Sequence, residues 1–287
     1  MLTKPRSIVQ PVLFVLVALA AMTTAPQEAA ARTCPDGTAA CVKVTINDMT
    51  TRYNAQAPAC DHAVIFSLSY LLTTQQYKKV IADPTFFQDT PWVNREDWNF
   101  AKLYLNAMDA YRPHTTTPGV PQAWQIALDA AHDQSVTGSG DLLLGINAHV
   151  NRDLPFALEA MGLVAPDGSS RKHDHDAINP MLAGVMPSIL DEAAARLDPT
   201  IPAALINLLP LTDLTFFQLL ALWREGAWQN AVRLVNATTA AQHAQVAASI
   251  EQSAATEAAL IRTTFSYLPL LGGAAQRDAY CAAHAMP

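Results

Sequence analysis

The sequence predicts an all-α protein, a single-domain helical bundle of about eight helices that follows an N-terminal signal peptide. The composition is the first reason, because the chain of 287 residues is 51% hydrophobic, rich in alanine and leucine, and holds only 11 glycines. The second is that apolar residues after residue 60 recur every three or four positions, which is the spacing of one helical face. The third is that no alternation of polar and apolar residues is long enough to indicate a strand.

The first 31 residues have the features of a secretory signal peptide. Lys4 and Arg6 supply positive charge, residues 12–22 supply an apolar core, and the alanines before Arg32 suit cleavage near Ala31. The apolar run is shorter than a typical membrane-spanning helix, so we expect a secreted protein without a stable membrane span; an uncleaved anchor is the alternative. The formal charge of −7 argues against a nucleic-acid partner, because phosphate binding requires clustered lysines and arginines.

The four cysteines lie in residues 32–60 and at the C-terminus. In an oxidising compartment we expect disulfides, and we predict Cys34 with Cys41, closing a short turn, and Cys60 with Cys281, tying the first helix to the C-terminus. A structural zinc site built from these thiols is the alternative, but no CxxC pair is present. Residues 61–287 are then expected to form the all-α domain.

Helices are expected in the first half of this domain after Asp61, after Pro91 and after Pro121. Asp61 can cap the first of them, which ends near Asp83. Proline suits the first turn of a helix, where its missing N–H costs nothing. The residues that share one face of the first helix are His62, Phe66, Tyr70, Thr73 and Tyr77, and those in one stripe of the second include Asp97, Phe100, Tyr104 and Ala107; the third helix carries Trp124.

Prolines also mark expected breaks in the second half. Pro155 cannot donate a hydrogen bond to the carbonyl of Asn151, so we expect a kink there or a helix end just before it. Pro187 is expected to separate two helices, and Thr212 or Asp213 to cap a later one. The helices expected beyond the central segment cover residues 176–186, 188–198, 213–235 and 239–267.

The polar residues that interrupt the apolar run beginning at Leu142 are the strongest functional candidates. His149 and Asp153 stand one turn apart on one helical face, and Asn147 and Asn151 form a second pair at the same spacing. The apolar flanks predict that at least one pair faces the interior, where an unpaired polar group is costly. Other side chains or a bound ion must therefore satisfy these groups.

The same stretch carries a resemblance to a known family. Residues 143–154 read Leu-Leu-Gly-Ile-Asn-Ala-His-Val-Asn-Arg-Asp-Leu, which resembles the signature segment of a bacterial all-helical family catalogued as a domain of unknown function. The resemblance extends to Phe66, Tyr70, Thr73, Phe87, Gln88, Asp89, Trp92, Phe100, Ala101, Tyr104, Ala107, Trp124, Arg224, Ala227, Trp228 and Ala231. It implies an all-helical domain and no particular activity, because the family has none assigned.

One functional hypothesis is a metal-dependent hydrolase. His149 and Asp153 could bind the same ion, zinc or another divalent metal, through an imidazole nitrogen and a carboxylate oxygen. His173, His175 and Asp89 are the residues that could complete the ligand set, leaving one position for an activated water. The order His-x-x-x-Asp-Leu-Pro also resembles, over these few residues only, that of helical zinc-dependent phospholipases C and single-strand nucleases.

Arg224 is a further candidate for catalysis. It shares a helical row with aromatic residues, so we expect it to be buried and paired with Asp153 or Asp97, or else to bind an anionic substrate. Snorkelling to the surface is the remaining interpretation. By the same reasoning, His149 and Asp153 could be a structural pair, and His173 could lie in a solvated loop.

The second functional hypothesis is a secreted binding protein without catalytic activity. Tyr70, Tyr104 and Trp124 would line a pocket between helices that holds a small apolar or amphiphilic ligand. Asn147 and Asn151 would supply its polar contacts. An apolar cavity at this position would favour binding, whereas three or more converging acids and histidines would favour the hydrolase.

Overall fold

The computed structural model describes residue 34 and residues 36–201, 215–267 and 273–284, which belong to one compact unit. Within these residues all regular structure is helical apart from two isolated β-bridges, which confirms the all-α prediction. The predicted signal peptide lies outside the described residues. The helices are α1 Ala39–Gln56, η1 Ala57–Ala59, α2 Val64–Val80, α3 Thr90–Ala110, α4 Gln122–His132, α5 Gly138–Ile146, η2 Asn147–Asp153, α6 Leu154–Met161, α7 Lys172–Arg196, α9 Phe216–Val235, α10 Ala240–Thr264 and α11 Ala274–His284.

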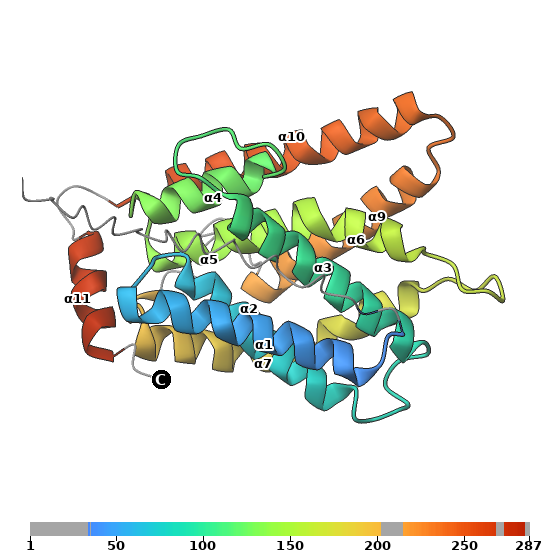
Figure 1. Cartoon of the computed structure of the whole chain (residues 1–287), viewed down its shortest axis with the longest axis horizontal. Helices are drawn as coiled ribbons and strands as arrows, with labels where there is room; N and C mark the ends of the chain where they lie inside the picture. Colours follow the sequence, from blue (N-terminus) through green and yellow to red (C-terminus); the bar gives the residue numbers. More distant parts are fainter. Residues whose placement is uncertain (1–33, 35, 202–214, 268–272, 285–287) are drawn as a thin grey trace, which may run out of the picture. The chain divides into compact units, whose positions relative to one another are not determined.

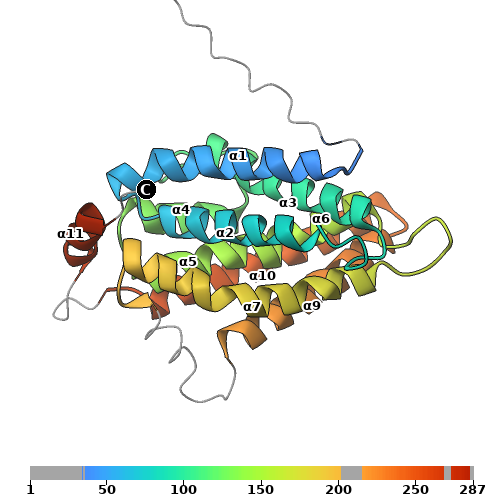
Figure 2. The same cartoon turned by 90° about the horizontal axis from the view of Figure 1, so that it is seen from below.

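The continuous segment formed by α5, η2 and α6 runs through the middle of the bundle (Figures 1 and 2). Helix α2 packs against α1, α5 and α7, and η2 packs against α3, α4, α9 and α10. Leu142, Leu144 and Leu154 of this segment have no exposed surface. Asn147, His149 and Asp153 of η2 are therefore buried among other helices, which explains why their polar atoms need partners inside the protein.

The central segment changes its helical register next to Pro155. Residues 147–153 form a π-helix, and the amide of Leu154 donates to the carbonyl of His149, five residues earlier. Pro155 then falls in the first turn of α6, the position in a helix where proline is best tolerated. A wider π turn thus takes the place of the kink or helix end expected at Pro155. Such turns are rare in proteins, and those that occur are often found at functional sites.

The predicted helix break at Pro187 is wrong. Helix α7 is continuous from residue 172 to residue 196 and contains both Pro180 and Pro187. Both prolines are on the exposed side of the helix, as is Ala183, whose carbonyl loses its partner at Pro187. Water can bond to that carbonyl, while Met186 and Ile189 on the other side remain buried in the core. Burial of this face therefore outweighs the missing hydrogen bonds.

Side-chain caps mark the starts of several helices. Asp89 accepts a hydrogen bond from the Trp92 amide at the start of α3. Thr215 and Thr239 form capping boxes with the residues three positions later, at the starts of α9 and α10. The expected caps Thr212 and Asp213 lie outside the described residues, and the described part of that helix begins at Phe216.

Both predicted disulfides are present. Cys34 is bonded to Cys41 and Cys60 to Cys281, with Cα–Cα distances of 5.3 and 5.9 Å. Two helices that the sequence did not predict are tied down by them: Cys41 lies in α1, and Cys281 lies in α11.

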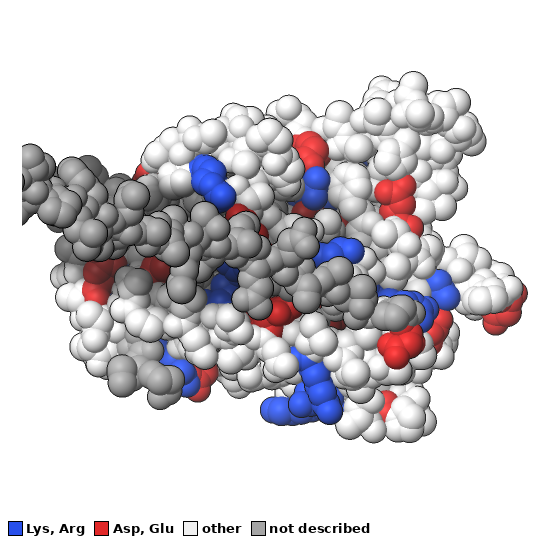
Figure 3. Space-filling model, in the orientation of Figure 1, with Lys and Arg blue, Asp and Glu red and all other residues white. Residues whose placement is uncertain are grey.

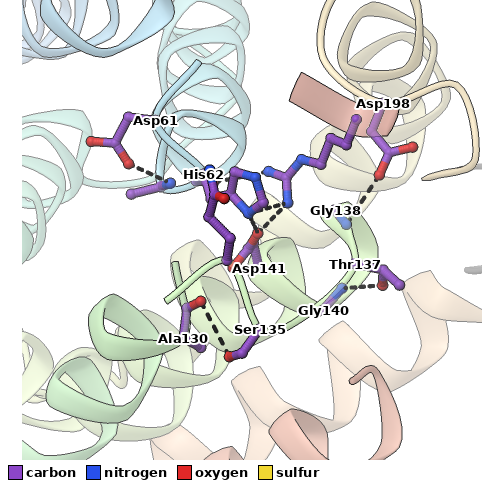
Figure 4. A network of polar contacts seen from close by, with 12 residues as sticks. Asp61, His62, Ala130, Ser135, Thr137, Gly138, Gly140, Asp141 and Asp198 are labelled. Carbon is purple, nitrogen blue, oxygen red and sulfur yellow. Dashed lines mark hydrogen bonds and ion pairs between the residues drawn. The ribbon is translucent and has the colours of Figure 1, made fainter. Parts of the chain in front are cut away.

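A buried polar cluster holds α11 beside the second disulfide. His62 and Asp141 face one another at the starts of α2 and α5 (Figure 4). Arg277 of α11 donates to the Asp141 carboxylate and to the His62 carbonyl. The Asp278 carboxylate lies 3.1 Å from Nε2 of the His62 ring. The C-terminal helix is therefore joined to the bundle by covalent and ionic contacts together.

Lysines, arginines, aspartates and glutamates are interspersed on the face shown in Figure 3, without a large patch of one sign. None of the described helices is both long enough and apolar enough to cross a membrane.

Candidate functional site: a central cavity with unpartnered polar groups

A cavity of about 120 Å³ lies between α2, α3, α5, η2, α7 and α9. Most of its wall is apolar. The exceptions that bear on function are Tyr70, Glu96, Asp97, His149 and Arg224. An apolar cavity with a few polar groups aimed at one space is the usual form of a small-molecule site.

His149 is buried in this wall without a hydrogen bond. Its side chain is packed face to face on the Phe100 ring, with centroids 3.4 Å apart, and the Tyr70 ring lies 4.6 Å away. Among the described residues neither nitrogen of the imidazole has a hydrogen-bond partner. Burial lowers the pKa of His149 below its ordinary value, against the opposing effect of Asp153, so the ring is neutral at pH 7.

Asp153 lies beside His149, as the spacing predicted, but its oxygens have other partners. The distance from His149 Nδ1 to Asp153 Oδ2 is 3.6 Å, which is too long for a hydrogen bond. Trp124 Nε1 donates to Oδ2 at 2.7 Å, and Arg152 Nη1 donates to Oδ1 at 2.9 Å. Arg152 also pairs with Glu251 on α10. The fully buried Asp153 is thus held in a network that leads away from the cavity.

Four of the five residues expected to bind a ligand, Asn147, Asn151, Tyr104 and Trp124, do not line the central cavity. Asn147 donates to the carbonyl of Ala254, and Asn151 donates to the Asn147 side chain. Tyr104 is bonded to Ser67 at 2.7 Å. Of the five expected ligand-binding residues, Tyr70 lines the central cavity, and its buried hydroxyl has no hydrogen-bond partner among the described residues.

The structure does not gather the proposed metal ligands. Asp89 pairs with Arg171, His173 is beside Asp174, and His175 Nε2 lies 3.2 Å from the Arg224 carbonyl. Burial, with the neighbouring charge of Arg224, lowers the pKa of His175 to about 2. In the described part of the chain, the groups of three side chains close enough to share an ion are Cys34 with Asp36 and Cys41, already a disulfide, and exposed His114 with His132 and Asp133.

Two acids of the cavity wall come from one turn of α3. Burial raises the pKa of Glu96 to about 7, against the opposing effect of Arg224. Burial and the neighbouring Glu96 raise the pKa of Asp97 to about 8, against a hydrogen bond from Thr45. The helical pattern predicted Asp97 on the same face as Phe100 and Tyr104 and as a possible partner of Arg224, but the position of Glu96 in that pattern gave no sign that it faces the core.

Arg224 is buried, as predicted, but forms neither expected ion pair. Its Nε donates to Asn179 Oδ1 at 2.8 Å, and its Nη2 donates to the His175 carbonyl at 2.7 Å. Helices α7 and α9 therefore hold the guanidinium in a fixed place at the cavity wall. Burial lowers the pKa of Arg224, although an arginine stays charged at pH 7.

Comparison with known proteins places this fold and site in a family. Residues 42–264 match a family model described as a family of unknown function, DUF5995. The match covers most of the chain, including α2, η2 and α9, so the chain belongs to this family, and the resemblance of residues 143–154 is confirmed. No curated protein and no solved structure matches the chain.

Proposed function

We propose that this protein binds a small, mostly apolar molecule in the central cavity and holds the polar group of that molecule at His149 and Tyr70. The observation that carries the proposal is that both residues line one cavity with buried polar atoms that no described residue satisfies. An unsatisfied buried polar group costs about 1–3 kcal/mol. A ligand that supplies the missing partners would offset this cost.

A metal-dependent hydrolase built on His149 and Asp153 has less support. Trp124 and Arg152 already occupy the Asp153 oxygens, and His173 and His175 contact other parts of α7 and α9. This function requires stoichiometric metal in the purified protein. If the purified protein contains this metal and a folded His149→Ala variant does not, the hydrolase hypothesis would be supported.

We also propose that the protein is exported. The charged and apolar residues before Ala31 support a signal peptide, and the two disulfides are typical of an oxidising compartment. N-terminal sequencing of the exported chain, which should then begin at Arg32, tests the proposal. A chain retained inside the cell with its first residues intact would contradict it.

Titration calorimetry with 1-butanol, 1-hexanol and 1-octanol tests binding in the cavity. We expect at least one of these alcohols to bind, and Ser69→Leu to abolish binding because the larger side chain enters the cavity. Ser253→Leu, on the exposed side of α10, is the matched control and should bind as the original protein does. Failure of all three alcohols to bind, or equal binding by both variants, would contradict the proposal.

A further inference from the structure

We infer, resting on the proposed function above, that the cavity ligand carries a protonated amine on its apolar body and that Asp97 and Glu96 bind this amine. The inference concerns the part of the cavity wall formed by α3, which neither the family match nor the pair of His149 and Asp153 explains.

A deprotonated Asp97 would have no counter-charge of its own among the described residues of the cavity wall. Neither Glu96 nor Asp97 forms an ion pair with any residue in the described ranges, although both line the cavity. Arg224 is the positive charge that acts on Glu96, and its Nε and Nη2 are bonded to α7. If Arg224 balances Glu96, the Asp97 carboxylate is left without a counter-charge. A monovalent cation in the cavity would supply it.

The unsatisfied polar atoms of the cavity wall can all act as hydrogen-bond acceptors. Asp97 Oδ2, the Tyr70 hydroxyl oxygen and a neutral His149 imidazole can each accept a hydrogen bond, and described residues donate none to them. An alkylammonium group has three donors and no acceptor. The rings of Phe66 and Phe100 in the same wall would also attract a cation.

An organic cation fits this cavity wall better than a metal ion or an anion. Glu96, Asp97 and His149 are not among the described groups of three side chains whose ligand atoms lie within 4.8 Å of one another, so together they do not form a compact metal site. A carboxylate ligand would place a negative charge beside two carboxyl groups whose charged forms burial already disfavours. A protonated amine on a short apolar chain fits both the charge and the apolar wall.

Binding of an amine at Asp97 should also release a proton from this carboxyl group. At pH 7 the raised pKa of Asp97, about 8, keeps much of this carboxyl protonated in the empty cavity, and an ammonium group would displace the proton. The titratable or charged groups facing it are Glu96 on α3, Tyr70 and Tyr77 on α2, His149 in η2 and Arg224 on α9. Affinity for an amine should therefore rise with pH from 6 to 8, by up to ~10-fold per unit, because an alkylamine stays protonated throughout.

The experiment compares hexylamine, 1-hexanol and hexanoate, which share one chain, by titration calorimetry on the full exported protein. We expect hexylamine to bind at least ~10-fold more tightly than 1-hexanol at pH 8, and hexanoate to bind most weakly. The heat of hexylamine binding at pH 7 should change with the ionisation enthalpy of the buffer. Asp97→Asn should remove the preference for the amine, whereas Asp191→Asn, on the exposed side of α7, should keep it.

The outcomes separate this inference from the proposed function. Binding of 1-hexanol without a preference for hexylamine would overturn the inference and leave the cavity as a binding site. Tightest binding of hexanoate would also overturn it, while failure of all three compounds would contradict both proposals. Should Asp97→Asn not fold, an affinity of the original protein for hexylamine that does not change between pH 6 and pH 8 would itself overturn the inference.

Discussion

Tyr70 and Tyr104 show how two buried tyrosines of neighbouring helices can have different roles. Both have almost no exposed surface, and their rings lie 5.9 Å apart. The Tyr104 hydroxyl is bonded to Ser67, which in turn donates to Gln56. The Tyr70 hydroxyl faces the cavity with no partner among the described residues. Burial raises the pKa of both hydroxyls, so each is neutral at pH 7.

This difference predicts opposite effects of the same substitution. Tyr104→Phe removes a satisfied hydrogen bond and leaves Ser67 with one partner fewer, so it should lower the free energy of unfolding by about 1 kcal/mol. Tyr70→Phe removes a hydroxyl that the folded protein does not satisfy, and should leave stability unchanged or raise it by up to about 1 kcal/mol. Urea denaturation of both variants measures this difference.

A loss of stability in Tyr70→Phe equal to that in Tyr104→Phe would show that the Tyr70 hydroxyl has a structural partner. The Tyr70→Phe variant should also bind 1-hexanol more weakly, by roughly 5-fold for one lost hydrogen bond. Stability and affinity would then change independently, which is the signature of a residue that serves the ligand rather than the fold.

At the scale of helices, the close approach of α5 to α2 depends on Gly145. A methyl group added at Gly145 would lie 2.5 Å from the Phe66 ring, which lines the cavity. The contact therefore connects the end of α5, two residues before η2 begins, to the cavity wall on α2. A methyl group added at Gly184, on the exposed side of α7, would have no neighbouring atom within 4 Å.

These two glycines give a matched pair of variants. Gly145→Ala should lower the free energy of unfolding by about 1–3 kcal/mol, because it overpacks the core. Gly184→Ala should raise it by about 0.5–1 kcal/mol, because alanine loses less entropy in a helix. Thermal or urea denaturation measures both. A neutral Gly145→Ala variant with unchanged 1-hexanol affinity would mean that Phe66 adjusts freely, contrary to this account of the cavity wall.

The π-helix η2 is an element that local sequence rules could not assign. The rules identified the conflict at Pro155, and the chain could have met it with a kink, a helix end or a wider turn. Packing of η2 against helices on several sides selects the wider turn, since it keeps His149, Asn147 and Asp153 inside while Pro155 starts α6. In α7, likewise, burial of one helix face outweighs the tendency of Pro187 to end the helix, so the helix continues through this residue.

For the whole molecule, the two disulfides differ mainly in the length of chain they close. Cys34 and Cys41 are 7 residues apart, whereas Cys60 and Cys281 are 221 residues apart. Loop-closure entropy then gives about 2 kcal/mol of stabilisation for the first and about 5 kcal/mol for the second. The second also positions α11, whose Arg277 enters the buried cluster with His62 and Asp141.

Paired serine variants test this difference. Replacing Cys60 and Cys281 together should lower the free energy of unfolding by about 5 kcal/mol, a large part of the stability of a typical domain. Replacing Cys34 and Cys41 together should lower it by about 2 kcal/mol. Equilibrium denaturation under non-reducing conditions provides both values. An equal loss in the two variants would contradict the loop-length account.

The sequence by itself determined the helical class, most helix faces and the adjacency of His149 and Asp153, and it allowed both disulfides to be predicted among three possible pairings. These features follow from local spacing and from the small number of possible cysteine pairs. Tertiary structure decided which polar groups are satisfied: Trp124 reaches Asp153 from 29 positions away, and Asn179 and His175 hold Arg224 from a different helix. It also brought Glu96 and Asp97 to the cavity of Tyr70 and His149. Hydrogen-bond partners and cavities depend on how distant helices pack, and the periodicity of a single helix carries no information about that.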